Sequence, residues 1–362
     1  MVLHRVGCKA RRCYGWAADN GKICSRKRVI QPMSRPQQRI QPMLDQLDRQ
    51  IVCSLQLDGR ASWGRIAEVL EVPERTVARR GLRLLGDKTL RMHAVPSTST
   101  SPEDAELLVR LVCDHGTTLD VAKTLARNPN AYYVGVTSGS SDVYVTVYAR
   151  GRGQTGALAE RLIGARGVRH ATAHTMLRLF TDASQWQAGA LTDEQATGLR
   201  RPLIVGPKPS LDALDHELMQ LLGQDARASA ATLSAQLSAS HTTVRRRLQS
   251  LFDTQVIRAQ ATIDLALLGM PVETVIWLDI HASRLEDAGK QLARERAVRF
   301  AIATTGPSNL VAMAAFADLD ALYTFLTGTV GALPGLLGSG VTPILRVIKR
   351  GGGTLVPTSS VG

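Results

Sequence analysis

The stretch TTVRRRLQSL at Thr242–Leu251 decides the fold, because nearly the same basic phrase, TVARRGLRLL, stands earlier in the chain at Thr76–Leu85. The two phrases superimpose when Leu44 is aligned with Leu211, a register that we call the repeat register. It also places LDQLDRQIVCSLQLDGRAS, which begins at Leu44, on LDALDHELMQLLGQDARAS, which begins at Leu211, without a gap. Chance does not hold one register over about 140 residues, so we interpret the chain as an internal duplication.

The first part of each copy, residues 44–96 and 211–264, is predicted to form three short helices followed by a strand. Residues that favour a helix N-terminus stand where each helix would begin. They are Asp45, Ser62 and Pro73 in the first copy and Asp212, Ser229 and Ser240 in the second. The strand-like segments TLRMHAV and VIRAQATI follow the third helix. Three helices followed by such a strand are typical of a winged helix-turn-helix.

The second part of each copy, residues 104–181 and 271–350, alternates strand and helix patterns in the order βαββαβ. This order is that of the ferredoxin-like split unit. Near its end the register moves by one position, so that LRLF at 177–180 aligns with LRVI at 345–348. The predicted fold class is therefore α+β, a tandem duplication of a winged helix-turn-helix followed by a ferredoxin-like domain.

Three segments lie outside the two copies. Residues 182–210 are predicted to be a linker with room for one short helix near 192–199, and residues 351–362 are predicted to be disordered. Residues 1–43 hold ten Lys and Arg against one acidic residue, and so carry about +9 of the formal net charge of +13. We interpret them either as a disordered basic tail or as residues upstream of a translation start at Met43.

The basic tail also contains three cysteines, but their spacing is irregular and no CxxC pair occurs: Cys8, Cys13 and Cys24. No metal site and no cofactor is therefore predicted. No run of eighteen apolar residues is present, and no apolar block follows the basic N-terminus as it would in a signal peptide. The sequence predicts a cytoplasmic protein with no membrane partner.

The two repeated phrases have an apolar face and a basic, polar face when they are placed on helices. Val77 and Leu84 share one face, as do Val244, Leu248 and Leu251. Arginine can donate two hydrogen bonds to guanine, and glutamine can bond adenine in a similar way, which suits a helix in the major groove of double-stranded DNA. The predicted DNA-binding residues are Arg75, Thr76, Arg79, Arg80 and Arg83 in the first copy, and Thr242, Thr243, Arg245, Arg246, Arg247 and Gln249 in the second.

A basic helix face is usually no more than a solvated surface. Two such faces, each on the third helix of a three-helix unit, favour DNA binding over that alternative. Arg80 and Arg247 lie at the flank of their helices, where a guanidinium can reach a phosphate or brace the neighbouring helix.

The order and spacing of the motifs resemble those of the Lrp/AsnC (feast/famine) family of transcriptional regulators. The resemblance is carried by LDQLDRQI, DGRAS, TVARRGLRL and TSGSSDV in the first copy, and by LDALDHEL, DARAS, TTVRRRLQSL and TTGPSNL in the second. Single motifs are weak, but together they cover nearly the whole chain outside the tail, the linker and the C-terminus. The resemblance implies two complete family units in one chain, each with a winged helix-turn-helix and an effector-binding and dimerisation domain.

The resemblance also implies functional residues and partners. Arg80 and Arg247 match the recognition-helix arginine that the family leads us to expect. A loop between the second and third ferredoxin-like strands is expected to help bind an amino acid or a related small molecule, which implies effector-binding roles for Gly139, Asp142, Gly306 and Asn309. A tight hairpin turn is the alternative explanation for the two glycines. Homo-oligomers through the ferredoxin-like domains are expected, and the sequence leaves open whether the copies pair within or between chains.

Several positions depart from the family pattern. Gly81 stands where an apolar helix residue is expected, and should cost roughly 1 kcal/mol of helix propensity and leave a gap in the packing. Trp63 and Gly64 are unusual near the start of a second helix. The second copy has Asn309 where the first has Asp142, so we expect a cationic amine to lose its charged partner there.

Two other functions compete with a DNA-binding regulator. One is an enzyme, because the siroheme decarboxylases resemble the same architecture and use histidines around a tetrapyrrole; His93, His170 and His174 are the candidates here. The equivalent positions in the second copy show no matching chemistry, so no catalytic residues are predicted and the protein is not expected to be an enzyme. The other competitor is a ligand-sensing assembly protein without DNA binding, which Gly81 favours and the retained arginines oppose.

Overall fold

The computed structural model describes residues 44–96, 105–149, 154–183, 186, 188–200, 210–351 and 353–354. The basic tail with its three cysteines lies outside these residues, as does nearly all of the C-terminal segment predicted to be disordered. Gly353 and Thr354 are an exception, because they form a short strand, β11, beside Lys349 and Arg350. No helix in the described part of the chain is long and apolar enough to cross a membrane.

Each copy begins with a three-helix unit and a strand. The first unit has α1 (Gln46–Leu57), α2 (Trp63–Leu70), α3 (Glu74–Gly86) and β1 (Leu90–Pro96). The second has α7 (Ala213–Gln224), α8 (Ala230–Leu237), α9 (His241–Asp253) and β6 (Ile257–Ile263). All six predicted N-cap positions are confirmed, and five of them accept a hydrogen bond from a backbone N–H of the first turn through their side chains.

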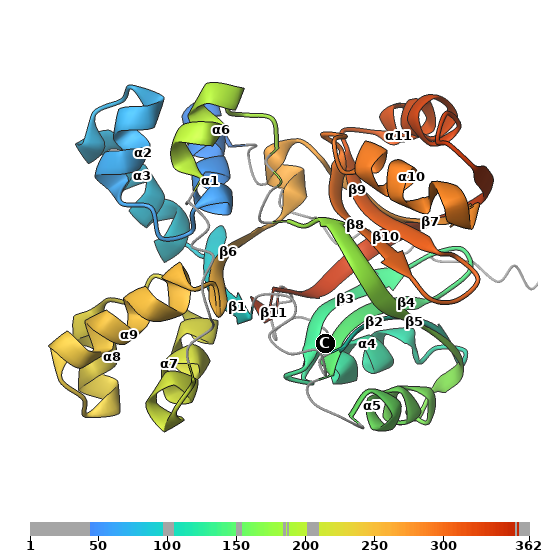
Figure 1. Cartoon of the computed structure of the whole chain (residues 1–362), viewed down its shortest axis with the longest axis horizontal. Helices are drawn as coiled ribbons and strands as arrows, with labels where there is room; N and C mark the ends of the chain where they lie inside the picture. The colour runs from blue at the N-terminus through green and yellow to red at the C-terminus, as the bar shows by residue number, and fades with distance from the viewer. Residues whose placement is uncertain are drawn as a thin grey trace, which may run out of the picture. The chain divides into compact units, whose positions relative to one another are not determined.

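Each copy continues with a ferredoxin-like unit in the predicted order (Figure 1). The first contains β2 (Ala105–Cys113), α4 (Thr118–Ala126), β3 (Ala131–Thr137), β4 (Val143–Ala149), α5 (Gln154–Ile163) and β5 (Val168–Thr181). The second contains β7 (Val272–Ile280), α10 (Leu285–Leu292), β8 (Val298–Thr304), β9 (Leu310–Phe316), α11 (Leu319–Phe325) and β10 (Leu336–Arg350). Short turns of helix stand at Leu265–Leu268, Ala282–Arg284 and Leu326–Val330.

The two copies pair with each other inside one chain around a pseudo-twofold axis. β1 and β6 run antiparallel, and at their centre His93 pairs with Gln260, which is its own equivalent in the repeat register. In the sheet, β5 pairs with β8 and β3 pairs with β10, through the matching contacts Met176↔Thr304 and Ile344↔Thr137. The structure thus places within one chain the pairing that the sequence left open.

The nine-stranded sheet has the order β11-β10-β3-β4-β2-β5-β8-β9-β7, and it closes on itself because β10 also pairs with β7. Apolar side chains of α4 and α5 cover the first unit, and those of α10 and α11 cover the second. A further apolar cluster, which includes Tyr133, Tyr144, Trp277 and Ile302, fills the space between the two units. The two ferredoxin-like units therefore share one core.

The segment predicted to be a linker is largely packed against the first three-helix unit. It contains α6 (Asp193–Leu199), whose N-terminus carries a capping box between Thr192 and Gln195. Trp186 and Leu199 are buried in the same apolar cluster as α1 and α2, and the indole N–H of Trp186 donates to the carbonyl of Arg296 at 2.8 Å. The short helix predicted near 192–199 is thus present as α6, and the described part of the linker around it packs against the first three-helix unit.

The expectation of a packing gap at Gly81 is wrong. A Cβ atom added to Gly81 would lie 2.4 Å from the ring of Trp63, so the indole already fills the space that an apolar side chain would take. The equivalent pair in the second copy is Ala230 on α8 and Leu248 on α9. The two copies therefore fill the same helix–helix contact with a large and a small residue in opposite places.

This exchange of volume predicts the outcome of a double-mutant cycle. Gly81→Leu alone should destabilise the protein by about 1–3 kcal/mol through overpacking, and Trp63→Ala alone by about 2–4 kcal/mol through a cavity. The double variant reproduces the pair of the second copy. Its loss of unfolding free energy should be smaller than the sum of the two single losses by at least about 1 kcal/mol, which is the coupling between the two positions. Urea unfolding of the full chain and its three variants measures this coupling. Additive losses would contradict the compensation.

Candidate nucleic-acid interface

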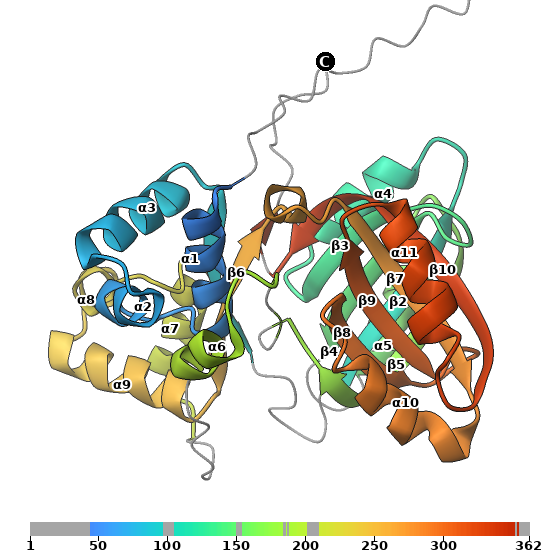
Figure 2. The same cartoon turned by 90° about the horizontal axis from the view of Figure 1, so that it is seen from above.

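The third helix of each three-helix unit, α3 or α9, has a basic face that is exposed to solvent. Figure 2 shows where the two helices lie in their three-helix units. On α3 the buried positions are Val77, Gly81 and Leu84, and on α9 they are Val244, Leu248, Leu251 and Phe252. The predicted DNA-binding residues that are exposed are Arg75, Arg79 and Arg83 on α3, and Thr242, Arg245, Arg246 and Gln249 on α9. Thr76 and Thr243 are half-buried at the first turn.

Arg80 and Arg247 are engaged inside the protein. Arg80 forms ion pairs with Asp45 and Asp48 at the start of α1, and Arg247 pairs in the same way with Asp212 and Asp215 at the start of α7. The hydrogen bond from Arg80 lowers the pKa of Asp45, and the bonds to Asp45 and Asp48 raise the pKa of Arg80. Of the two roles considered for these arginines, the structure shows the brace.

Arg83 is also partly engaged, because its guanidinium pairs with Asp48 at 2.5 Å while about half of its side chain remains exposed. The equivalent position on α9 is Ser250, so the second copy lacks this contact.

At the N-terminus of α9, Ser240 accepts from the backbone N–H of Thr243 at 3.1 Å and donates to its hydroxyl at 2.8 Å. The Thr243 hydroxyl is thus oriented by the helix cap.

The two exposed faces are not identical. In the repeat register only one exposed arginine is shared, as Arg79 and Arg246. At three other exposed positions α3 carries Arg75, Leu82 and Arg83, where α9 carries Thr242, Gln249 and Ser250. At its two ends α3 also exposes Glu74 and Gly86, where α9 carries His241 and Asp253. Arg245 on α9 replaces Ala78. The two helices therefore display different arrangements of hydrogen-bond donors.

Two equivalent arginines hold the three-helix units together across the pseudo-twofold axis. Arg60 donates to the carbonyl of Ala226 at 2.6 Å, and Arg227 donates to the carbonyls of Gly59 and Ala61 at 2.9 and 3.1 Å. Each also stacks on an aromatic ring, Arg60 on Phe252 and Arg227 on Trp63. Sequence analysis missed this contact, although the repeated DGRA and DARA motifs that contain both arginines carried the signal.

The side chains assigned to effector binding serve the turns in which they stand. Asp142 accepts from the backbone N–H of Cys113 at 2.7 Å. Asn309 accepts from the N–H of Ile280 at 2.9 Å and also donates to its carbonyl at 2.6 Å. Carboxylate and amide thus perform the same structural task in the two copies. The Asp142 carboxylate is occupied by the backbone N–H of Cys113 on β2, and the expected loss of a charged effector partner at Asn309 stays a prediction.

The two turn glycines adopt a left-handed backbone conformation, with φ of +95° at Gly139 and +98° at Gly306. A Cβ atom at Gly306 would also lie 2.8 Å from Nδ1 of His174. Backbone geometry therefore explains both glycines, as the hairpin-turn alternative proposed.

The histidines considered for catalysis do not come together. His93 is buried in the β1–β6 pair and contacts the carbonyl of Gly223, while His174 is buried on β5 and contacts the carbonyl of Thr305 at 2.9 Å. His170 is exposed on the same strand. Burial lowers the pKa of both His93 and His174. Among the described residues, no group of three or more His, Cys, Asp or Glu is placed to hold a metal ion.

Comparison with known families matches three segments of the chain. Residues 44–85 and 211–251 match the AsnC-type helix-turn-helix domain, and residues 273–354 match the Lrp/AsnC ligand binding domain. These segments contain both basic helices and the second ferredoxin-like unit.

Two archaeal proteins are similar over the length of about one copy. The HTH-type transcriptional regulator Ptr1 of Methanocaldococcus jannaschii is 30% identical over 142 residues, which are 39% of this chain and 96% of that protein. An uncharacterised HTH-type transcriptional regulator of Pyrococcus horikoshii is 31% identical over 147 residues, which are 38% of this chain and 90% of that protein.

A solved structure extends the similarity of fold to both copies. The siroheme decarboxylase NirDL, in co-complex with an iron-uroporphyrin III analogue, superposes on 84% of this chain and 93% of its own with a TM-score of 0.57 and 12% sequence identity. Identity at that level shows a shared fold only. Ptr1, in contrast, is aligned over nearly its whole length, and the matched domains carry the motifs that define both parts of a copy. The chain therefore belongs to the Lrp/AsnC family.

Proposed function

We propose that the protein is a sequence-specific, DNA-binding transcriptional regulator that reads two half-sites with α3 and α9 of the same chain. One observation carries the proposal: two third helices with exposed arginines are held in one pseudo-twofold unit by β1, β6 and the two crossing arginines. The family relationship supports it, because the similar archaeal proteins are named as HTH-type transcriptional regulators.

The exposed residues have separate roles in this proposal. Arg79 and Arg246 occupy the same place in both helices and are assigned to base edges in the major groove. Arg75, Arg245 and Gln249 add contacts that differ between the half-sites, and Arg83, Thr76, Thr242 and Thr243 are assigned to the backbone or adjacent bases. Arg80 and Arg247 are assigned to the orientation of the helices rather than to DNA.

We also propose that DNA binding or assembly of the protein responds to a bound small molecule, an amino acid or a related compound. The turns at Gly139 and Gly306 remain candidates for contact with it through their backbones, with Asp142 and Asn309 holding the turn shape. Further assembly of these chains through the ferredoxin-like domains is proposed as well. The β5·β8 and β3·β10 pairings are already used within one chain, so assembly would need other surfaces.

A siroheme-decarboxylase-like enzyme is the second candidate, because the fold similarity to NirDL spans both copies. The cavity between the strands of the two copies and β6 has a volume of about 70 Å³, below the roughly 300–1,000 Å³ of ordinary ligand pockets, and none of the three candidate histidines lines it. A larger hollow of about 770 Å³ beside the three-helix units includes His93 but neither His170 nor His174. The dispersed histidines also offer no common site. The DNA-binding proposal is therefore preferred.

DNA binding is tested by fluorescence-anisotropy titration of the full chain with duplex from the upstream region of its own gene, over a series of salt concentrations. We expect the protein to prefer some duplex sequences over others. The logarithm of the association constant should fall linearly with the logarithm of the salt concentration, with a slope of about −0.9 for each phosphate contacted. Arg79→Ala/Arg246→Ala should lose at least about tenfold in affinity and most of the preference over a scrambled duplex. Equal, weak binding of every duplex by both proteins would contradict the assignment, and tetrapyrrole binding would then be assayed.

The brace and the reader can be separated by a matched pair of single variants. Arg80→Ala should lower the free energy of unfolding by about 2 kcal/mol, because buried Asp48 loses a charged hydrogen-bond partner. Arg79→Ala, one residue away and exposed, should change it by less than about 0.5 kcal/mol. Urea unfolding followed by circular dichroism makes the comparison. Equal free energies of unfolding of the two variants would contradict the structural role assigned to Arg80.

A further inference from the structure

The duplication places a buried glutamate at the same point in both ferredoxin-like units. Glu106 on β2 and Glu273 on β7 are equivalent in the repeat register. The side chain of Glu273 is 11% exposed, and Glu106 as a residue is 4% exposed. A buried carboxylate is costly unless a cation or hydrogen-bond donors compensate it. The two copies can therefore be compared for what compensates each carboxylate.

Glu273 is compensated by two arginines of its own copy. Arg350 at the end of β10 donates to both carboxylate oxygens at 2.6 Å, and Arg299 on β8 donates to one of them at 3.2 Å. Both arginines are nearly buried, and each lies over an aromatic ring, Arg350 over Tyr133 and Arg299 over Trp186. This carboxylate is thus held by two nearly buried guanidinium groups.

Glu106 has neither of the two equivalent arginines beside it. The equivalent of Arg299 in the first copy is Tyr132, and the equivalent of Arg350, one further position along in register, is Asp182. One carboxyl oxygen of Glu106, Oε2, is buried without a hydrogen-bond partner in the described part of the chain. Burial, followed by the nearby Asp182, raises the pKa of Glu106 from its ordinary value of 4.5 to about 8.

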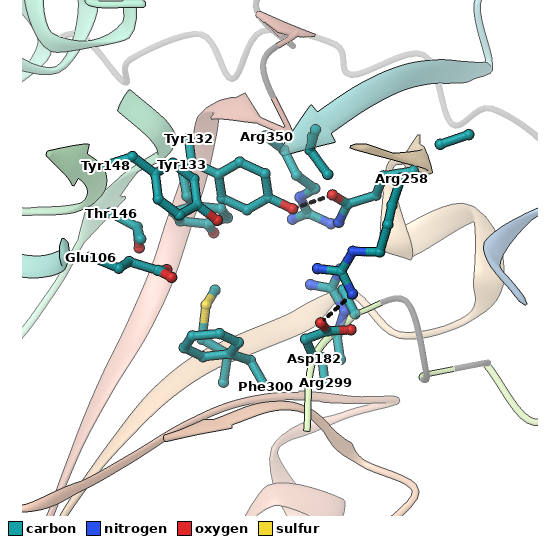
Figure 3. A pocket seen from close by; sticks show the side chains of 15 residues that line it. Glu106, Tyr132, Tyr133, Thr146, Tyr148, Asp182, Arg258, Arg299, Phe300 and Arg350 are labelled. Carbon is teal, nitrogen blue, oxygen red and sulfur yellow. Dashed lines mark hydrogen bonds and ion pairs between the residues drawn. The ribbon is translucent and has the colours of Figure 1, made fainter. Parts of the chain in front are cut away.

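A cavity of about 70 Å³ lies beside the Glu106 carboxyl, where the missing arginines would be (Figure 3). A single water molecule needs a cavity of at least roughly 10–15 Å³, so this cavity has room for more than one water. The close-up shows Glu106 facing Phe300 and the Asp182–Arg258 pair across an open centre. Its lining includes Tyr132, Thr146, Tyr148, Phe300, Met313 and Gln260.

Three arginines also line the wall, and each is engaged by a carboxylate: Arg258 by Asp182, and Arg299 and Arg350 by Glu273. Asp182 binds Arg258 of β6 at 2.6 Å, and the hydroxyl of Tyr132 donates to the side chain of Gln260, also on β6. The rings of Tyr132 and Tyr148 stack edge to face, 5.6 Å apart. Glu106 is thus an acid of this wall that forms no ion pair with a described residue, and aromatic rings and the thioether of Met313 lie beside it. Such surroundings favour a cation that carries a small apolar body.

We propose that this cavity is a binding site for a small organic cation, whose N–H donors bind Glu106 in the place that Arg299 and Arg350 take at Glu273. An alkylammonium or an alkylguanidinium of four to six non-hydrogen atoms has the required chemistry. The site is separate from the turns at Gly139 and Gly306. Its occupancy is measured without DNA, so failure of the DNA-binding proposal leaves this inference standing.

The site is tested on the full chain by ligand-observed NMR and by thermal unfolding, with n-propylammonium chloride and methylguanidinium chloride as separate probes. 1-Propanol and sodium propionate, of similar size, are the neutral and anionic controls. At least one cation should bind at least about tenfold more tightly than either control and raise Tm in a saturable way beyond equal sodium chloride. Failure of both cations to exceed the controls would overturn the proposal.

Two variants locate the bound cation. Glu106→Gln keeps the size of the side chain and should weaken cation binding at least tenfold while leaving the fold intact. Tyr132→Arg gives the first copy the residue of the second, and its guanidinium should take the place of the ligand and block the probe. Unchanged cation binding in Glu106→Gln would contradict the site. If Tyr132→Arg does not fold, Glu106→Gln alone decides.

The affinity for n-propylammonium should depend on pH, because Glu106 must lose its proton to bind a cation. Such an amine, with a pKa near that of lysine at about 10.4, stays charged from pH 6 to 8.5. With the pKa of Glu106 at about 8, the affinity for the amine should rise by close to two orders of magnitude from pH 6 to 8.5 and level off above pH 8. The titratable and charged groups around the cavity are the Asp182–Arg258 pair, Arg299 and Arg350, which bind Glu273, and the tyrosines 132, 144 and 148, whose pKa values burial raises. A flat profile would contradict the role of Glu106.

Discussion

The antiparallel pairing of the two copies within one chain is the constraint on which the rest of the structure depends. β1 meets β6 at His93 and Gln260, and β5·β8 and β3·β10 repeat the same relation in the sheet. A two-chain assembly loses translational and rotational freedom when it forms, whereas two copies on one chain meet at a high effective concentration. Both third helices are therefore held in one unit at any protein concentration at which the chain is folded.

The duplication also frees equivalent positions to differ. In a symmetric homodimer a single residue must suit both sides of the axis, but here each copy has its own. Trp63 and Gly81 fill the contact that Ala230 and Leu248 fill in the second copy, and the exposed face of α3 differs from that of α9. The same freedom left Glu106 without the arginines of Glu273 and a cavity beside it.

Local patterns were sufficient to predict the elements, because their causes lie within a few residues of one another. Helix caps such as Asp45 and Ser229, and strands such as β3 and β9, follow from capping chemistry and apolar periodicity, and the repeat supported each assignment twice. The exposed arginines of the basic helices were predictable for the same reason, because residues two apart on a helix, such as Val77 and Arg79, lie on different faces.

What could not be predicted depends on contacts between distant segments. Nothing near Gly81 reveals that Trp63 fills its space, and Arg80 gives no local sign that its partner is Asp48, on another helix. The burial of Trp186 in the segment between the copies, and the Oε2 atom of Glu106 that has no hydrogen-bond partner among the described residues, likewise appear only when the copies are in place.

The central claim is that one chain carries two unequal readers of DNA. Selection of bound duplexes from a randomised library by the purified full chain, followed by sequencing, tests it most directly. Two unequal readers should select a bipartite site with two different half-sites. The site should become a symmetric palindrome when four positions of α3 receive the residues of α9 through Arg75→Thr, Ala78→Arg, Leu82→Gln and Arg83→Ser. Enrichment of a single half-site, or of no sequence by either protein, would contradict it.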